Sequence, residues 1–187
     1  MSAPTAEWIK RAFVPEDDED AIVPLWCASY MRSVEGIARG AHKPHGLAEE
    51  AKQDPEVRAA TRKMWDEHAP LVEWLLRNAD VEVICDPERP RASAAGPAVI
   101  WGFACTSGDV IHYISIKRKT AQVPGLAAEL VRDLLGSRLE RPCTFTHELV
   151  EMHSGRWGLG IPRSWGWDSL WLPRRLAAVV VGPRRAA

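Results

Sequence analysis

Three consecutive cations, Lys117, Arg118 and Lys119, separate an apolar stretch of the sequence from an amphipathic one. Residues 110–135 read VIHYISIKRKTAQVPGLAAELVRDLL. The free backbone amides at the start of a helix and the helix dipole both favour a bound anion. A cationic turn in that place therefore indicates a site for a phosphate or polyphosphate group.

The segments on both sides of this turn predict how it is held. Residues 109–116 alternate as a strand does, and the residues that follow Gly125 place leucine and valine on one helical face. Gly125 allows close approach of the backbone to a ligand, and Ala127 keeps the first helical turn thin. We expect a strand, a loop that presents the amides of residues 122–127, and a helix capped by Gly136.

The remaining pattern predicts an α/β (α+β) fold in one domain that spans residues 1–187. The other expected elements are a strand over 9–14, a helix over 18–33, a long loop over 36–54, a second helix that begins at Pro55 and is kinked or split by Pro70, and strands over 80–86, 98–108 and 142–150. Two meandering strands before a strand–helix–strand unit favour a mixed sheet with helices on both faces. The segment 151–187 is rich in Trp and Arg and predicts irregular structure.

Composition and charge limit the possible partners. The formal net charge of −1 over 187 residues gives no overall field that favours nucleic acid or membrane. No apolar run approaches the roughly 20 residues of a membrane span, and the N-terminus lacks the apolar core of a signal peptide. The four cysteines form no CxxC pair, which is typical of reduced thiols. We expect a cytoplasmic protein that does not bind membranes.

The segment QVPGLA fits the Q/R-x-x-G-x-G/A signature of the GNAT superfamily of N-acetyltransferases, and the chain resembles that family over residues 8–150. LWCASYMRS and VIHYISIKR are similar to segments of GNAT-like proteins from tailed phages. The resemblance implies a twisted, mixed and mostly antiparallel sheet. It also implies an acetyl-coenzyme A-dependent N-acyltransferase that passes the acetyl group directly to a small or macromolecular amine, in the host cytoplasm if a phage encodes it.

The resemblance also implies roles for the residues of the turn. In the family this loop holds the pyrophosphate of acetyl-coenzyme A, and the strand before it pairs with the pantetheine arm. The implied pyrophosphate contacts are Gln122, Val123, Gly125, Leu126 and Ala127, and the charges of Lys117, Arg118 and Lys119 lie where a polyphosphate would bind. The implied pantetheine contacts are the backbone groups of Ile114, Ser115 and Ile116. Pro124 departs from the expected set of donors because it has no N–H.

Acetyl transfer to an amine needs a base for the ammonium proton and an acid for the leaving thiolate. Candidate catalytic residues are Tyr113, His147 and Glu148. His147 and Glu148 are neighbours on an expected strand, so only one of them can point into a cleft. The family commonly uses a Tyr as the acid on a fourth helix, whereas no Tyr follows Tyr113 here. A structural role stays open for each candidate and for His112.

The first helix carries Trp26, Ser29 and Tyr30, and in the family this region roofs the acceptor site. These residues are therefore candidate acceptor contacts, although Trp26 and Tyr30 also suit packing of the helix on the sheet. His42 and His45 form an HKPH segment, but two histidines without further ligands are a weak metal signal. We expect no metal site.

The C-terminal segment adds Trp157, Trp165, Trp167 and Trp171 among several arginines. Such a set can stack nucleobases and pair with phosphates, cover a sheet edge, or form the interface of a homodimer. Three functions therefore stay open. They are the acyltransferase, a catalytically inactive GNAT-like binding or virion-associated module, and a phage-type enzyme that acylates a modified nucleobase in DNA.

Overall fold

The computed structural model describes residues 7–30, 55–94, 96–146, 152, 155 and 157–167. Its strands are β1 (Ile9–Ala12), β2 (Asp80–Cys85), β3 (Ile100–Ser107), β4 (Val110–Ile116), β5 (Thr144–Phe145) and β6 (Gly166–Trp167). Its helices are α1 (Pro15–Tyr30), α4 (Pro55–Asn78), α5 (Arg118–Ala121), α6 (Leu126–Leu135) and the 3-10 helix η1 (Gly136–Glu140). The strands predicted over 9–14, 80–86, 98–108 and 109–116 are confirmed.

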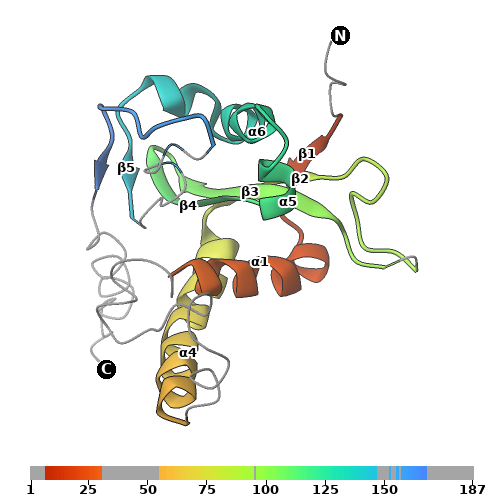
Figure 1. Cartoon of the computed structure of the whole chain (residues 1–187), viewed down its shortest axis with the longest axis vertical. Coiled ribbons are helices and arrows are strands. Elements are labelled where there is room, and N and C mark those ends of the chain that lie inside the picture. The colour runs from red at the N-terminus through yellow and green to blue at the C-terminus, as the bar shows by residue number, and fades with distance from the viewer. Residues whose placement is uncertain are drawn as a thin grey trace, which may run out of the picture.

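The six strands form one mixed sheet in the order β1-β2-β3-β4-β5-β6. The first four strands are antiparallel to their neighbours, whereas β5 runs parallel to β4 and β6 runs parallel to β5. Helix α6 covers one face of this sheet, and α1 and α4 lie on the other face (Figure 1). The prediction of a mixed sheet in an α/β chain is therefore confirmed.

Helix α6 buries its leucine and valine stripe against strands β3 and β4. Met152, Trp157 and Trp165 lie in the same hydrophobic cluster, and the Trp165 indole donates to Arg138 O at 3.1 Å. Within the segment 151–187, which the sequence predicts to be irregular, residues 166–167 form the short strand β6 and two tryptophans complete the core. The apolar area that these rings remove from water holds this part of the segment on the domain.

The opposite face of the sheet has its own core, built around three aromatic rings. Trp26 of α1 stacks on Tyr113 of β4 with ring centroids 4.8 Å apart, and Phe103 of β3 lies 6.2 Å from Trp26. Val72 and Leu75 of α4 are buried in the same cluster. Helix α1 is therefore held on the sheet by apolar contact between residues that are distant in sequence.

Both helices of this layer contain an internal proline. Helix α4 continues through Pro70, so of the two expected alternatives, a kink or a split, the split is wrong. Pro70 has no N–H, so the carbonyl of Asp66 lacks its hydrogen-bond donor in the helix. Both residues are exposed, so water can donate to that carbonyl instead. In α1, Pro24 likewise leaves the carbonyl of Asp20 without a helical donor, and both residues are exposed.

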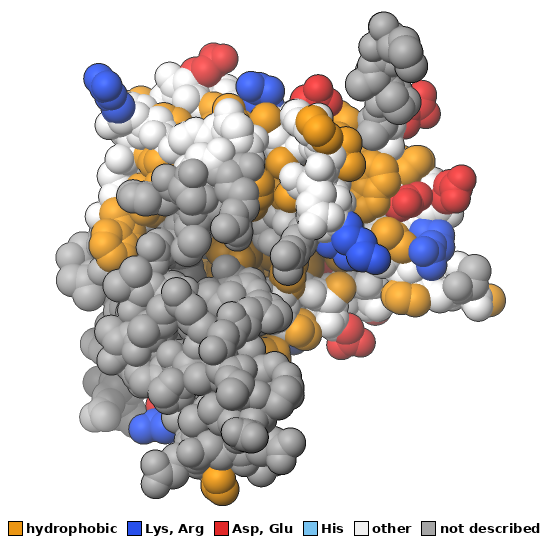
Figure 2. All heavy atoms as spheres, in the orientation of Figure 1, with side chains coloured by type: hydrophobic (Ala, Val, Ile, Leu, Met, Phe, Trp, Pro, Cys, Tyr) orange, Lys and Arg blue, Asp and Glu red, His pale blue; other side chains and the backbone are white. Residues whose placement is uncertain are grey.

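Charged side chains are interspersed over the described surface. On the face that Figure 2 shows, Lys and Arg alternate with Asp and Glu and form no large region of one sign. Several of them are ion-paired across elements, such as Lys10 with Asp133 at 2.9 Å and Arg141 with Asp109 at 2.6 Å. This distribution fits the near-zero net charge.

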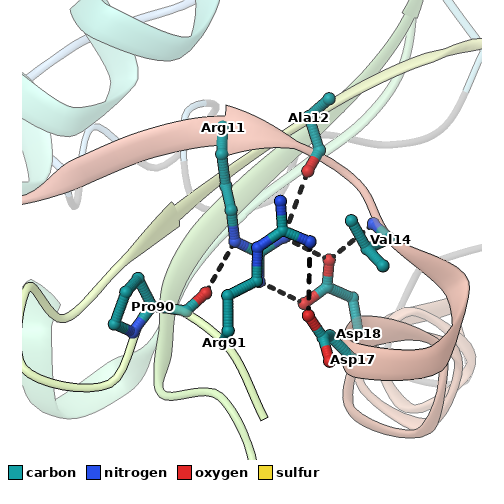
Figure 3. A network of polar contacts seen from close by, with 7 residues as sticks. All are labelled: Arg11, Ala12, Val14, Asp17, Asp18, Pro90 and Arg91. Atoms are coloured by element: carbon teal, nitrogen blue, oxygen red, sulfur yellow. Dashed lines mark hydrogen bonds and ion pairs between the residues drawn. The ribbon is translucent and has the colours of Figure 1, made fainter.

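A buried ion pair fixes the junction of β1 and α1 (Figure 3). The Arg11 guanidinium donates to both carboxylate oxygens of Asp18, at 2.6 and 2.7 Å, and to Pro90 O at 2.7 Å. Asp18 is fully buried and also accepts the Val14 N–H at 2.9 Å, just before the helix begins. This contact satisfies an amide at the helix start, so α1 begins at Pro15 and not at Asp18 as the sequence predicted.

We expect Asp18→Ala to lower the free energy of unfolding by about 3–5 kcal/mol, because it leaves the Arg11 charge buried and unpaired. Asp17→Ala is the matched control. Asp17 pairs with Arg91, whose side chain is 53% exposed, and surface pairs contribute about 1 kcal/mol or less. Urea unfolding followed by circular dichroism measures both values, and equal losses in the two variants would contradict this account of the junction.

Candidate functional site

Strand β4 has one edge that is only partly paired. It pairs with β3 along its whole length, but with β5 only at Val110 and Ile111. The last contact on that side is the Thr146 N–H, which donates to Ile111 O at 3.0 Å. Beyond it, no strand in the described part of the chain pairs with this edge of β4.

The backbone groups on this edge can be identified from the register. The Lys117 N–H donates to Trp101 O at 2.7 Å, which places this pair on the β3 side. Hydrogen-bonded and non-hydrogen-bonded pairs alternate between antiparallel strands, so Ile116 and Ile114 are in non-hydrogen-bonded positions opposite β3. Their N–H and C=O groups therefore point to the edge that β5 leaves unpaired.

A bulge separates the two halves of β4. Tyr113 is opposite Cys105 and Ile111 is opposite Thr106, so His112 is an additional residue on this strand. A bulge bends its strand and increases the local twist. It lies next to Ile111, where the pairing of β4 with β5 ends among the described residues.

The cationic turn is more compact than the sequence predicted. Residues 118–121 form the short helix α5, and the expected open loop that presents all the amides of 122–127 is wrong. Backbone carbonyls of the turn accept the N–H groups of Gln122, Val123 and Leu126. Pro124 has no N–H. Gly125, Ala127 and Ala128 keep N–H groups for which the described residues provide no acceptor.

The described cations of the turn are available to a ligand. Lys117 and Lys119 are exposed and make no ion pair with any described residue, whereas the side chain of Arg118 lies outside the description. Gly125 has φ 79°, and a Cβ built on it would meet no atom within 4 Å. The turn therefore combines positive charge, a few free amides and open space in front of Gly125.

Two candidate residues from the sequence are core residues in the structure. Trp26 is fully buried and Tyr113 is 6% exposed, and their rings stack between α1 and the sheet. This geometry places neither ring on the unpaired edge of β4. The backbone of Ser29 lies in the last turn of α1 and Tyr30 ends that helix, but their side chains lie outside the description.

His112 is buried on β4 and contacts two hydroxyl groups. Its Nε2 lies 2.9 Å from Ser107 Oγ, and its Nδ1 lies 3.2 Å from Thr146 Oγ1. Burial lowers the pKa of His112 from 6.5 to about 4, so the imidazole is neutral at physiological pH. A neutral imidazole that uses both nitrogens in this way connects the β3–β4 turn with the end of β5.

Several sequence candidates fall outside the described residues. They are His42, His45, His147, Glu148 and Trp171. Among the residues that are described, no group of three or more His, Cys, Asp or Glu side chains is placed to hold a metal ion. None of the described helices combines the length and hydrophobicity that crossing a membrane requires.

The sequence did not reveal two features of this site. Helix α5 had one available signal, since Lys, Arg and Ala in KRKTA all favour helix. The bulge at His112 had no signal in the sequence, because it depends on how β4 pairs with β3 and β5.

Comparisons with protein-family models, characterised proteins and solved structures find no match to this chain.

We expect the depressed pKa of His112 to make stability sensitive to acid. The unfolded imidazole takes up a proton below about pH 6.5, whereas the folded one resists protonation down to about pH 4. The contribution of His112 to the free energy of unfolding is complete above about pH 6.5. It falls by about 3 kcal/mol as the pH falls to about 4.

The measurement is urea unfolding of the wild type and of His112→Gln at a series of pH values. Comparing the two proteins removes the contribution of the other titrating groups, because both proteins contain them. The stability difference between them should change with pH over the stated window. A difference that stays constant would show that His112 titrates normally in the folded protein.

Proposed function

We propose that this protein is an acetyl-coenzyme A-dependent N-acyltransferase with the fold of the GNAT superfamily. One observation carries the proposal. In the described part of the chain, parallel strands β4 and β5 begin together and pair only as far as Ile111, and the edge of β4 beyond that point leads directly to the cationic turn and the start of α6. An extended ligand with amides along its length and a polyphosphate at one end matches this arrangement. The amides would pair with the edge of β4, and the polyphosphate would reach the cationic turn and the start of α6.

The unpaired edge supports binding of the pantetheine arm. Ile114 and Ile116 offer N–H and C=O groups in the spacing of a strand, and an extended ligand with amides can pair with them as an added strand does. The pyrophosphate would then reach the amides of Gly125 and Ala127, with Lys117 and Lys119 close in sequence to neutralise its charge.

The reaction would be a direct transfer at the thioester. The amine nitrogen attacks the carbonyl carbon, the C–S bond breaks, the nitrogen loses a proton to a base, and the thiolate leaves. His112 and Tyr113 are buried in packed surroundings, which argues against either as that base. His147 and Glu148 follow Thr146 directly in sequence and stay our candidates.

A catalytically inactive binding module is the second candidate. It is favoured by the compact turn, in which only part of the amides of residues 122–127 are free, and by the buried position of Tyr113. The nucleobase-modifying enzyme has less support. Trp157 and Trp165 are buried against α6, and of the described C-terminal tryptophans only Trp167 is exposed enough to stack on a base.

Isothermal titration with acetyl-coenzyme A tests the site. We expect Gly125→Asp to weaken binding at least about tenfold, because a carboxylate in front of the free amides repels phosphate. Asp tolerates a positive φ at a cost of about 1 kcal/mol, and a Cβ at this position meets no neighbour, so the variant should fold.

Gly108→Asp is the matched control, since Gly108 has φ 59° and equally open surroundings in the β3–β4 turn. It should bind acetyl-coenzyme A as the wild type does. Binding by Gly125→Asp at wild-type strength, or no wild-type binding at millimolar ligand, would contradict the proposed site. Release of free thiol in the presence of a panel of amines then separates the enzyme from the inactive binding module.

A further inference from the structure

A small cavity lies on the other face of the sheet, between α1 and the strand ends next to the cationic turn. Its volume is about 160 Å³. Its lining includes Ala21, Ile22 and Leu25 on one side of α1, Phe103 in the first half of β3, and Lys117, the residue after β4. It is distinct from the unpaired edge of β4, which lies towards β5.

The lining is almost entirely apolar. Ile22 and Phe103 are buried, and Leu25 keeps 37% of its surface exposed, which is unusual for a large apolar side chain of this protein. A cavity of about 150 Å³ lined by aliphatic and aromatic groups accepts a molecule the size of benzene. The shape and chemistry of this cavity therefore suit one small ring or a short branched chain.

Lys117 is the single charged residue among those that line the cavity. Its flexible four-carbon stem allows the ammonium group to reach an anion at the mouth. Two carboxylates near the start of α1 are already engaged, since Asp18 pairs with Arg11 and Asp17 pairs with Arg91. Lys117 makes no ion pair with a described residue, so its charge is left to complement an incoming anion.

We propose that this cavity binds a small carboxylic acid with an aromatic or branched apolar body, about the size of benzoate. The apolar part occupies the cavity lined by Ile22, Leu25 and Phe103, and the carboxylate pairs with Lys117. The proposal does not rest on the acyltransferase function, because the cavity and the free edge of β4 are different surfaces that share only the cationic turn.

Fluorine NMR titration with para-fluorobenzoate tests the site, with para-fluorobenzyl alcohol as the neutral probe. Ala21→Leu should fill the cavity and weaken binding of both probes at least about tenfold. Ala59→Leu is the control, because Ala59 is also an exposed helical alanine and lies on α4. Lys117→Gln should weaken the acid about tenfold and leave the alcohol within about twofold.

Acetyl-coenzyme A binding separates this proposal from the previous one. Ala21→Leu should bind acetyl-coenzyme A as the wild type does, and Gly125→Asp should bind the fluorinated acid as the wild type does. The proposal is overturned if the wild type does not bind the acid, if Ala21→Leu still binds it, or if Lys117→Gln binds it equally well. Loss of acetyl-coenzyme A binding in Ala21→Leu would overturn it too, by showing that the two surfaces form one site.

Discussion

Backbone N–H and C=O groups inside a sheet need partners, and this requirement governs the architecture around β4. The strand is central in the sheet, with β3 on one side and β5 on the other, yet β5 serves only its first two residues. Groups that lose their partner in such a place must bind water or a ligand. The amides and carbonyls of Ile114 and Ile116, for which the described strands provide no partner, therefore form a surface that can pair with an extended molecule.

Three features of the packing place this edge. The Arg11–Asp18 pair joins β1 to the start of α1, and the stack of Trp26 on Tyr113 joins α1 to β4. His112 joins the bulge of β4 to Thr146 at the end of β5. Because each contact links different elements, they hold the point where β4 and β5 lose their pairing at a fixed position in the sheet.

The sequence predicted the parts of the fold that depend on local pattern. The alternation of residues 109–116 and the apolar stripe of α6 are periodic, so the strand, the helix and the turn between them could be read directly. The path through Pro70 depended instead on which side of α4 faces water. The burial of Trp157 and Trp165 depended on contacts with α6, which lies more than twenty residues earlier in the chain. No local pattern carries such information.

The candidate site was predicted in its outline and not in its details. The cationic turn follows from the order of the elements, whereas a role for the backbone of Ile114, Ser115 and Ile116 was implied only by the resemblance. Helix α5, which occupies part of the amides of the turn, forms from a four-residue stretch that is too short for a periodic signal. The Arg11–Asp18 pair was also hidden, since an arginine on a four-residue edge strand and an aspartate in an acidic helix start look like surface residues.

Amide hydrogen exchange of β4, measured by NMR with and without acetyl-coenzyme A, tests the central claim most directly. Tyr113 and Ser115 are paired with β3, so their amides should exchange slowly in both states. The amides of Ile114 and Ile116 should exchange faster in the free protein and become protected when acetyl-coenzyme A is added. Equal protection of all four amides in the free protein, or no change at Ile114 and Ile116 on addition, would contradict the claim that this edge of β4 is a ligand-binding edge.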